Sequence, residues 1–507
     1  MWDDASIPQS RNLLSWQLIQ TLNIDAPMKI MIDVSDVLVT LLVIICLGDG
    51  SAINVKDYGA KGDGIQDDTE AIKLAVLNAN DGLLIFPMGK YLISSTIEVP
   101  LESTGVLGIR GVGGGTTIIM DGVGPALHMV GNHHGTSSPE SVTDLTMRQE
   151  LMPTIRDVEI LGRNSLANGI QLTNTFKAII QSVCIREVQY GIHLTERNRN
   201  VIIEGVHIYH CSKIGIFADQ VNIHQMNIDH SHISYNRESG IKIEGSEIRN
   251  LQITGNDIEY NYGQDEGRSA DVWIDCTKQG SSVREGSITG NTIQSKASNG
   301  GCNLFFEGNS NDPNKIGLWS IASNHISSQS INIYLKSTRG ITIVGNTFIR
   351  GFERHLLVEN SKNVVVGNNV FDKNEDYFDQ AAENRGGIRL MDSEHIALSD
   401  LIMDDVDQRA AIEVENGVQI SISGCHIPMT NCRGVDLTNC SVVKISDCLF
   451  SHTSNYIAGT FGVYLNDGST HVMVNDNIFN LARGYNAINV KNGKSVDFRS
   501  NMEIKSR

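Results

Sequence analysis

A short sequence pattern recurs from about residue 155 to the C-terminus: an apolar pair, a Gly-Asn or its equivalent, another apolar pair, a variable loop and then Gly-Ile-x-Leu. The Asn positions are 256, 291, 324, 346 and 368, so successive repeats are 35, 33, 22 and 22 residues long. Periods of this size are typical of solenoids, and the short β-branched segments alternate with period 2, as strands do. We therefore predict an all-β fold in which each repeat is one coil of a parallel β-helix, with three short strands separated by turns.

Charge and cysteine content narrow the range of partners. The formal net charge of −18 argues against nucleic acid or an anionic membrane as a partner. It leaves an acidic polysaccharide open, because local basic residues or a bound cation can offset the charge. The nine Cys residues include no CxxC pair and no Cys/His zinc spacing. Cys425 and Cys448 occupy the Asn position of successive repeats, so we interpret them as buried ladder residues, with a disulfide across coils as the alternative.

Residues 1–52 are predicted to be an N-terminal extension with a signal peptide. Residues 37–50 contain an apolar run of about a dozen residues, which is too short to span a bilayer and has the length of a signal-peptide core. Met28 would then be the start, and cleavage would fall near Ala52. A buried hydrophobic strand is the alternative. The prediction is a protein that is secreted or periplasmic, and in either case extracytoplasmic.

Residues 53–150 are predicted to form a capping segment and the first coils, and residues 151–507 the β-helix repeats. Ile53–Ala79 has the pattern of a strand, a Gly-rich turn and a helix, with Asp67 or Asp68 as the N-cap. An amphipathic helix at this position would cover the open end of the solenoid, where core residues and unpaired strand edges are otherwise exposed.

Two segments, DYGAKGDGIQDDTEAI at Asp57–Ile72 and FPMGKYLISSTI at Phe86–Ile97, accompany the Gly-Asn repeats. Together they resemble the pectate-lyase-like superfamily, which implies a single-stranded right-handed parallel β-helix with an N-terminal capping helix. That superfamily includes polysaccharide lyases, polygalacturonase-type hydrolases, mannuronan C5-epimerases and phage tailspikes, so the resemblance indicates the fold and not the reaction. The Asn-Thr-Asp and Gly-His-Gly motifs of polygalacturonases are absent, and so is the Tyr-Gly-Phe-Asp-Pro-His-Glu motif of the epimerases.

Stacked coils turn equivalent positions into rows on the surface. In Gly-Ile-x-Leu-x the two apolar residues point into the core, and both x positions point outward. The first outward row is Gln171, His193, Phe217, Lys242, Trp273, Phe305, Tyr334, Leu357, Arg389, Glu413, Asp436, Tyr464 and Asn489. The second outward row is Thr173, Thr195, Asp219, Glu244, Asp275, Glu307, Lys336, Glu359, Met391, Glu415, Thr438 and Asn466.

The stretch from His193 to Tyr334 is predicted to be an exposed stripe that binds sugar rings. Solvent-facing aromatic residues on consecutive coils are costly without a ligand. The predicted substrate-binding residues are Phe217, Trp273, Phe305 and Tyr334, with Tyr209 and Arg268 from adjoining loops. The alternative is that a long loop packs over the stripe and buries it.

The first functional hypothesis is a polysaccharide lyase that cleaves a uronic-acid-containing polymer by β-elimination. The reaction needs a base for the C5 proton, a group that neutralises the carboxylate and an acid for the leaving oxygen. We predict Lys242 as the base, with Tyr235, Tyr209 or His193 as the acid or as an alternative base. Arg237 or Arg268 would neutralise the carboxylate.

A calcium ion is the predicted cofactor, and no organic cofactor is expected. Asp219, Glu244 and Asp275 would supply oxygen ligands, of which Ca²⁺ takes six to eight. A lysine base near calcium on this face is what the resemblance to β-helix lyases implies.

The second hypothesis is a glycoside hydrolase, which needs two carboxylates about 5 Å apart for retention or about 6.5–9.5 Å apart for inversion. Asp219 with Glu244, or Glu244 with Asp275, would serve as the catalytic pair, and Glu413 with Asp436 is a further pair. The third hypothesis is a non-catalytic carbohydrate-binding solenoid or a tailspike-like adhesin. The expected partner is a polysaccharide, which the lyase hypothesis makes acidic, and neither nucleic acid nor a membrane is expected. The sequence does not indicate the oligomeric state.

Overall fold

The computed structural model describes residues 52–135, 138–263, 267–377, 385–404, 406, 409–429, 432–452, 461–481, 486–492 and 494–505. These residues belong to one compact unit, Ser51–Arg507. The predicted signal peptide lies outside the described residues, so secretion stays a prediction. Within the described ranges, no helix combines the length and the apolar character needed to cross a membrane.

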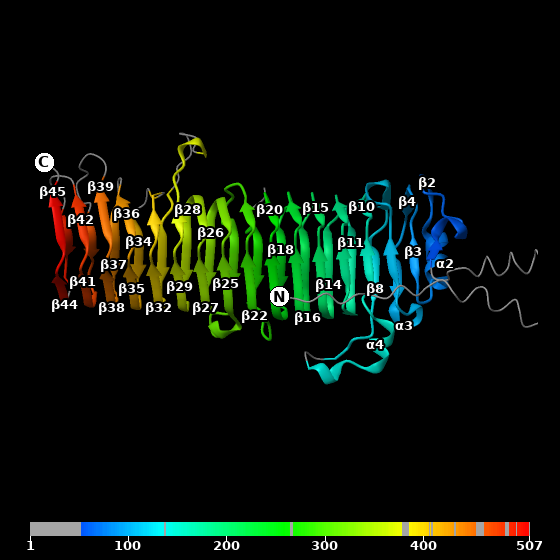
Figure 1. Ribbon diagram of the computed structural model, residues 1–507, viewed down its shortest axis with the longest axis horizontal. Helices are drawn as coiled ribbons and strands as arrows, with labels where there is room; N and C mark the ends of the chain where they lie inside the picture. Colours follow the sequence, from blue (N-terminus) through cyan, green and yellow to red (C-terminus); the bar gives the residue numbers. More distant parts are fainter. Residues whose placement is uncertain are drawn as a thin grey trace, which may run out of the picture. The chain divides into compact units, whose positions relative to one another are not determined.

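Short strands pair in parallel and wrap into coils that follow one another in chain order (Figure 1). Each coil passes through three sheets, which we call sheets I, II and III, and each strand pairs with its counterparts in neighbouring coils. The outcome confirms the predicted all-β parallel β-helix. Four long strands bend from one sheet into the next: β14 (Tyr190–Glu204), β16 (Ile214–Asp229), β26 (His325–Lys336) and β28 (Thr347–Glu359).

The strands are distributed over the three sheets as follows. Sheet I contains β5 (Ile97–Pro100), β8 (Gly124–Val130), β11 (Ala167–Phe176), the first part of β14 (Tyr190–Glu204) and of β16 (Ile214–Asp229), β18 (Ser239–Glu244), β21 (Ala270–Asp275), β24 (Cys302–Glu307), the last part of β26 (His325–Lys336) and of β28 (Thr347–Glu359), β31 (Ile388–Met391), β34 (Ala410–Glu415), β37 (Arg433–Thr438), β40 (Phe461–Leu465) and β43 (Asn486–Val490). Sheet II contains β1 (Ala52–Asn54), β3 (Leu83–Ile85), β6 (Gly108–Arg110), β9 (Thr154–Arg156), β12 (Ile179–Gln181), the last parts of β14 and β16, β19 (Glu247–Thr254), β22 (Ser282–Thr289), β25 (Ile316–Ala322), β27 (Arg339–Val344), β29 (Lys362–Gly367), β32 (Glu394–Ser399), β35 (Val418–Ser423), β38 (Ser441–Ser446), β41 (Thr470–Asn475) and β44 (Lys494–Arg499). Sheet III contains β2 (Asp63–Asp67), β4 (Gly89–Ile93), β7 (Thr116–Met120), β10 (Glu159–Gly162), β13 (Cys184–Arg186), β15 (His207–Tyr209), β17 (His232–Ser234), β20 (Asp257–Glu259), β23 (Thr292–Gln294), the first parts of β26 and β28, β30 (Val370–Phe371), β33 (Ile402–Met403), β36 (His426–Met429), β39 (Leu449–His452), β42 (Ile478–Leu481) and β45 (Met502–Lys505).

Helical segments are few and short. The α-helices are α2 (Thr69–Asn78), α3 (Leu101–Thr104) and α4 (Asp144–Gln149). The 3-10 segments are η1 (Val55–Tyr58), η2 (Gly113–Gly115), η3 (Pro139–Ser141), η4 (Pro313–Lys315) and η5 (Glu375–Tyr377).

Alternation within each strand decides which side chains enter the core. In β18, Ile241 and Ile243 are fully buried and pair with Ile216 and Ala218 of the preceding coil. Burial of an aliphatic side chain of this size contributes about 1.5–3 kcal/mol. The core therefore holds the coils in register, and the intervening residues, such as Lys242, form the outward rows.

A ladder of asparagine side chains links successive coils inside the β-helix. Each amide nitrogen donates to the amide oxygen of the next coil, as Asn346 Nδ2 does to Asn369 Oδ1 at 3.0 Å. The predicted position Asn368 is wrong, because residue 368 adopts φ 52° and forms the turn that Gly345 forms one coil earlier. This run of the ladder comprises Asn256, Asn291, Asn324, Asn346 and Asn369.

Cysteines continue this ladder farther along the chain. The backbone N–H of Cys448 donates to Asn477 Oδ1 at 3.0 Å, and the thiols of Cys425 and Cys448 are buried. Both are therefore ladder residues, as predicted. Cys425 and Cys448 are both free thiols, so the alternative of a disulfide across these coils is wrong.

Helix α2 covers the first coil, at the N-terminal end of the β-helix (Figure 1). It buries Ile72, Ala75 and Val76 against the first strands, which confirms the capping helix. The N-cap residue is Asp68, whose side chain makes no cap hydrogen bond, and the neighbouring Asp67 accepts the N–H of Thr69 at 3.0 Å. Asp68 is fully buried and instead accepts the N–H groups of Lys61 and Gly62 at 2.6 and 2.9 Å, which fixes the Gly-rich turn.

Candidate active site

The strand register of sheet I confirms the two predicted outward rows. His193 pairs with Phe217, Phe217 with Lys242, and Lys242 with Trp273. The row continues through coils that lack a clear Gly-Ile signal, from Phe305 to Tyr334 and Leu357. The second row is equally regular, since Asp219, Glu244, Asp275 and Glu307 pair in succession.

The aromatic residues of the first row do not form the exposed stripe that the sequence predicts. The exposed fraction is 6% for Phe217, 0% for Phe305 and 7% for Tyr334, while Trp273 is half-buried. The ring centroids of Phe305 and Tyr334 lie 4.9 Å apart, and those of Trp273 and Phe305 lie 5.5 Å apart. Each ring covers part of the next, so the expectation of an open stacking surface on Phe217, Phe305 and Tyr334 is wrong.

Arg268 lies over the most buried part of this row. Its guanidinium carbon is 4.5 Å from the ring centroid of Phe305 and 5.5 Å from that of Tyr334, a cation–π arrangement. Both rings belong, with Ala270 and Ile331, to a second apolar cluster outside the main core. Arg268, which lies in the segment before β21, thus covers Phe305 and Tyr334, in line with the alternative of a covering loop that the sequence left open.

Lys242 lies between two carboxylates, and its side chain is 8% exposed. Its Nζ is 2.7 Å from Glu238 Oε1, 2.7 Å from Glu244 Oε2 and 4.3 Å from the centroid of the Trp273 ring. Burial disfavours the ammonium form, but the two carboxylates outweigh burial and raise the pKa of Lys242. A base needs a neutral amine, so these surroundings favour an ion-pair role for Lys242 over the predicted catalytic one.

The predicted calcium ligands lie on neighbouring strands, but their oxygens are already engaged. Glu244 also lies 3.6 Å from Lys278 Nζ, and the two lysines outweigh burial and lower the pKa of Glu244. Asp275 Oδ1 accepts the N–H and the hydroxyl of Thr277 at 2.8 and 2.7 Å. Because two ammonium groups neutralise Glu244, this donor set fits a hard divalent cation poorly.

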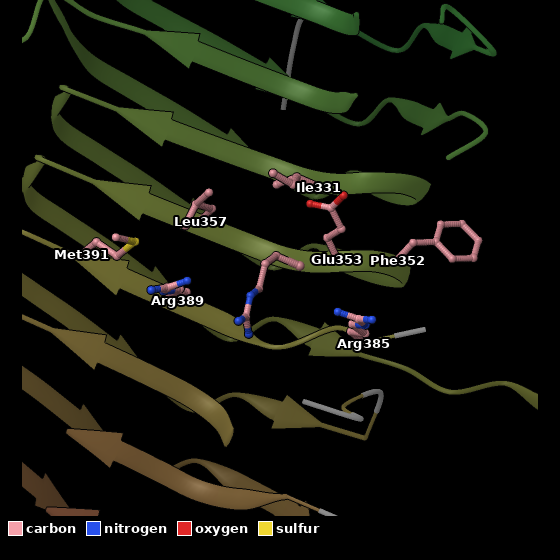
Figure 2. Close-up of a pocket in the computed structure, with 8 residues that line it drawn as sticks. Ile331, Phe352, Glu353, Leu357, Arg385, Arg389 and Met391 are labelled. Atoms are coloured by element: carbon pink, nitrogen blue, oxygen red, sulfur yellow. The ribbon is translucent and has the colours of Figure 1, made fainter. Parts of the chain in front are cut away.

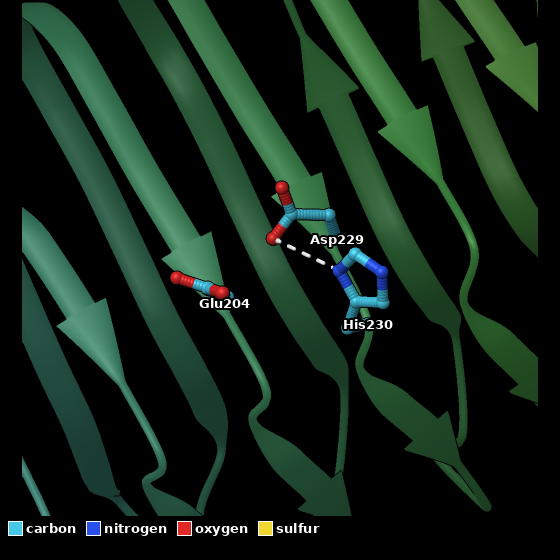
Figure 3. A group of neighbouring side chains, drawn as sticks. All are labelled: Glu204, Asp229 and His230. Atoms are coloured by element: carbon cyan, nitrogen blue, oxygen red, sulfur yellow. Dashed lines mark ion pairs between the residues drawn. The ribbon is translucent and has the colours of Figure 1, made fainter. Parts of the chain in front are cut away.

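Another group of side chains lies close enough to share a cation (Figure 3). In the described part of the chain it consists of Glu204, Asp229 and His230, whose ligand atoms lie within 4.8 Å of one another. Burial and the nearby Glu204 raise the pKa of Asp229. These residues follow sheet II at the ends of β14 and β16, so they lie apart from the sheet I rows, and we assign no ligand to them.

Three further predicted residues lie on sheet III or at its corner with sheet I. Tyr209 is in β15 of sheet III. Tyr235 follows β17 and is 52% exposed, with its ring stacked on Tyr260 at a centroid distance of 5.4 Å. Arg237 is exposed two residues later. Among the described residues, no hydrogen bond, ion pair or ring contact joins Tyr209, Tyr235 or Arg237 to the first row.

His193 has the arrangement of a general base. Its Nε2 is 3.4 Å from Asp219 Oδ2, and its ring stacks on Phe217 at 5.2 Å with an interplanar angle of 5°. Burial lowers the pKa of His193, and the hydrogen bond to Asp219 offsets this only in part, so the ring is neutral at neutral pH. When Nε2–H donates to Asp219, the lone pair lies on Nδ1, for which the described residues provide no partner.

Tyr190 and Lys213 complete the group that we call the His193 cluster, which consists of His193, Asp219, Tyr190 and Lys213. The Tyr190 ring centroid is 5.2 Å from that of His193, and Lys213 Nζ is 3.4 Å from the Tyr190 hydroxyl. Neither residue is in the predicted rows. Tyr190 directly precedes Gly191-Ile192, and its pairing partner Ile214 follows Lys213 and precedes Gly215-Ile216. The residues just before the Gly-Ile signals therefore include both Tyr190 and Lys213.

A pocket of about 510 Å³ opens on sheet I beyond Tyr334 (Figure 2). Arg389 is in the predicted first row, whereas Arg354 and Arg385 are not, and sequence reasoning missed them. The pocket is lined by Ile331, Phe352, Glu353, Arg354, Leu357, Arg385, Arg389 and Met391.

The carboxylates beyond this pocket are tied to arginines. Arg354 holds Glu413 through two hydrogen bonds of 3.2 and 3.3 Å. Asp436 is 3% exposed and pairs with Arg409, at 2.9 Å, and with Arg433. Both members of the further carboxylate pair predicted for hydrolysis are therefore paired with guanidinium groups.

A protein-family model described as rhamnogalacturonase A/epimerase, pectate lyase-like, matches residues 52–436. The chain belongs to this family. A second model, described as a right-handed beta helix region, matches residues 380–502 and gives the handedness of the coils. Membership of this pectate lyase-like family confirms the resemblance inferred from Asp57–Ile72, Phe86–Ile97 and the repeats.

The chain also resembles individual proteins over part of their length. Alginate lyase 7 of Azotobacter vinelandii is 31% identical over 182 residues, which is 33% of this chain and 20% of that protein. Mannuronan C5-epimerase AlgE6 of the same organism is 31% identical over 180 residues, with the same coverage of 33% and 20%. The chain thus spans a fifth or less of the length of the curated relatives that it matches.

Solved structures of low sequence identity also match. The AlgE6 A-module of Azotobacter vinelandii is 15% identical with a TM-score of 0.37, covering 82% of this chain and 98% of that chain. The Dettilon tailspike protein is 14% identical with a TM-score of 0.45, covering 84% and 68%. Scores at this level carry no argument about the reaction.

Proposed function

We propose that the protein is a polysaccharide lyase that cleaves a uronic-acid-containing polymer by β-elimination, with His193 as the base. The observation that carries the proposal is the neutral His193 imidazole, which is hydrogen-bonded to Asp219 and lies beside the ring of Tyr190. The Tyr190 hydroxyl in turn accepts a hydrogen bond from the ammonium group of Lys213. β-Elimination needs a base, a cation for the carboxylate and an acid for the leaving oxygen. The His193 cluster contains one group for each task.

In the proposed reaction, His193 Nδ1 takes the C5 proton of the uronate. The electron pair of that C–H bond forms the C4–C5 double bond, and the C4–O bond breaks. The Tyr190 hydroxyl gives its proton to the departing oxygen. Asp219 stabilises the imidazolium that forms through its hydrogen bond to Nε2, and Lys213 balances the negative charge that grows on the uronate carboxylate. Proton transfer by one positioned side chain contributes about 10²- to 10⁴-fold.

The carboxylates of sheet I favour this reaction over hydrolysis. A glycosidase needs a carboxylic acid with a raised pKa, whereas the pKa of Glu244 is lowered by Lys242 and Lys278, which outweigh its burial. Glu307 pairs with Lys336 at 3.2 Å, and Glu413 pairs with Arg354. These carboxylates are suited to ion pairing and not to donating a proton.

The substrate class follows from the family and from two relatives. Membership of the pectate lyase-like family supports a carbohydrate-active enzyme. The names of two partial relatives denote a lyase of alginate and an epimerase of mannuronan. On this basis we propose an acidic polysaccharide as the substrate. The proposed reaction uses no calcium ion, because the predicted ligand set fits this cation poorly.

The test is incubation with a panel of uronate and neutral polysaccharides, followed by unsaturated-uronate absorbance and reducing ends in parallel. We expect both signals to rise together on one or more uronate polymers and neither on the neutral ones. New reducing ends without absorbance would mean hydrolysis. A change in uronate stereochemistry by NMR without new ends would mean epimerisation. Either outcome contradicts the lyase proposal. The same two signals measured with and without a chelator test the calcium prediction.

A further inference from the structure

The pocket of Figure 2 lies far from the His193 cluster along the same sheet. Seven strand pairings of the first row separate His193 from Arg389. At about 4.8 Å for each strand, the two sites are roughly 34 Å apart. Phe305 and Tyr334, which are buried beneath Arg268, lie between them. The pocket is therefore a separate site and not an extension of the catalytic one.

Three guanidinium groups from separate segments line this pocket. Arg354 belongs to β28, Arg389 to β31, and Arg385 to the segment just before β31 (Figure 2). Two of them are anchored by carboxylates of β34: Arg354 by Glu413, and Arg389 by Glu415 at 2.9 Å. A guanidinium has five N–H donors, so Arg389 keeps several without a partner among the described residues. The anchoring fixes two planar donor groups at one side of a cavity.

The electrostatics of the pocket favour an anion. The whole chain carries a net charge of −18, yet three arginines line this pocket beside a single carboxylate, that of Glu353. Burial lowers the pKa of Arg354, and repulsion from Arg389 and Arg385 lowers it further against the opposing effect of Glu413. A bound carboxylate would relieve that repulsion and accept two parallel N–H bonds from one guanidinium group.

The remaining lining favours a sugar as the carrier of that anion. Ile331, Phe352, Leu357 and Met391 add apolar lining around the arginines. A sugar acid presents a carboxylate together with the apolar face of its ring, whereas a bare inorganic anion makes no use of apolar lining. The size of about 510 Å³ falls in the range of small-ligand sites.

We propose that this pocket is a second saccharide-binding site, which holds a carboxylate-bearing sugar unit of an acidic polymer. The choice of polymer rests on the proposed function. A polymer long enough to reach both sites gains affinity by multivalent attachment, whereas an oligosaccharide shorter than roughly 34 Å occupies one site at a time. The site thereby retains long chains on the enzyme.

The test measures binding without cleavage, by calorimetry on the His193→Ala variant. The probes are long alginate and polygalacturonate, their carboxyl-reduced forms and inorganic phosphate. In this background, Arg385→Gln with Arg389→Gln is expected to weaken binding of one or more acidic polymers at least tenfold. The matched control is Arg110→Gln with Arg339→Gln, which removes the same charge from sheet II and is expected to change the affinity less than twofold. Arg389→Lys keeps the charge but lacks the planar donor pair, so it is expected to weaken binding as well.

Several outcomes would overturn this proposal. These are equal affinity of the double variant and its control, the same loss on carboxyl-reduced polymer, or full competition by phosphate at matched anion concentration. Folding of each variant is checked by thermal unfolding. Arg385 is exposed and Glu415 is about half-exposed, so the substitutions strand no buried charge. If binding in this background depends on the arginines but the wild-type protein produces no unsaturated ends from the same polymer, only the lyase proposal is contradicted.

Discussion

The ammonium nitrogen of Lys242 lies 2.7 Å from Oε2 of Glu244, so the two residues that the sequence presents as rival catalysts neutralise each other. Oε1 of Glu238 lies at the same distance, 2.7 Å, from the Lys242 nitrogen. The group is therefore a charged, largely buried ion-pair network in the middle of the first row. A side chain that can still accept a proton, His193, lies two strands away in the same row.

His193→Ala is expected to lower kcat/KM on a uronate polymer by about 10²- to 10⁴-fold, because it removes the proton acceptor. The measurement is the initial rate of unsaturated-end formation. His395→Gln serves as the control, since it changes an exposed histidine on sheet II. Equal rates for wild type and His193→Ala would place the base elsewhere.

The pH profile of kcat/KM reports the protonation of His193. The base works only when neutral, and burial lowers the pKa of His193 below its ordinary value of about 6.5. Activity is therefore expected to fall as pH drops through a value below 6.5. In Asp219→Asn the stabilisation of the imidazolium is lost, so the acid limb should move to lower pH while kcat falls. Asp229→Asn, on another sheet, is expected to leave the profile unchanged, and an acid limb above 6.5 in wild type would contradict the assignment.

Lys242→Met should reduce stability more than activity. It leaves Glu238 and Glu244 without their shared ammonium group, at a cost of about 2 kcal/mol, because both carboxylates keep some contact with water. Urea unfolding measures the loss. Lys362→Met, which removes a more exposed pair with Glu394, is the control and should cost less than about 1 kcal/mol. If Lys242→Met folds normally but loses all activity, the original assignment of Lys242 as base regains support.

Phe305→Ala tests whether the aromatic row is structural. The side chain is fully buried in the second apolar cluster, so its truncation should destabilise the protein by about 3–5 kcal/mol. Affinity for short oligosaccharides, measured on folded protein, is expected to stay within twofold. Val365→Ala truncates an exposed apolar residue and is the matched control. A loss of affinity with unchanged stability would restore the predicted sugar-stacking role.

Glu150 gives the fold a pH dependence of its own. Burial raises its pKa to about 7, although the N–H groups of Asn132 and Phe176 oppose this. The unfolded chain ionises near 4.5, so stability should fall by a few kcal/mol as pH rises from about 4.5 to about 7, and should show no further loss from this group above that. Urea titrations across this range measure the slope. Glu150→Gln stays neutral and should lack this part of it; parallel slopes would contradict the prediction.

The repeat was enough to predict the fold and the outward rows, because the register follows from the buried Ile and Leu positions. The one ladder error, Asn368 for Asn369, arose where two consecutive asparagines fit the same pattern and only the backbone turn distinguishes them. Burial of Phe305 depends on Arg268, a lateral contact that no alternation encodes. Tyr190, Arg354 and Arg385 were missed because they lie before or beside the strand positions that the rows sample.

Because coils stack at a fixed interval, the separation between His193 and Arg389 comes in discrete steps. Inserting or deleting one coil between them would change it by about 4.8 Å while leaving both sites intact. The β-helix then acts as a ruler: the shortest polymer able to engage both ends is set by how many coils lie between them, and evolution or engineering can adjust that length one coil at a time.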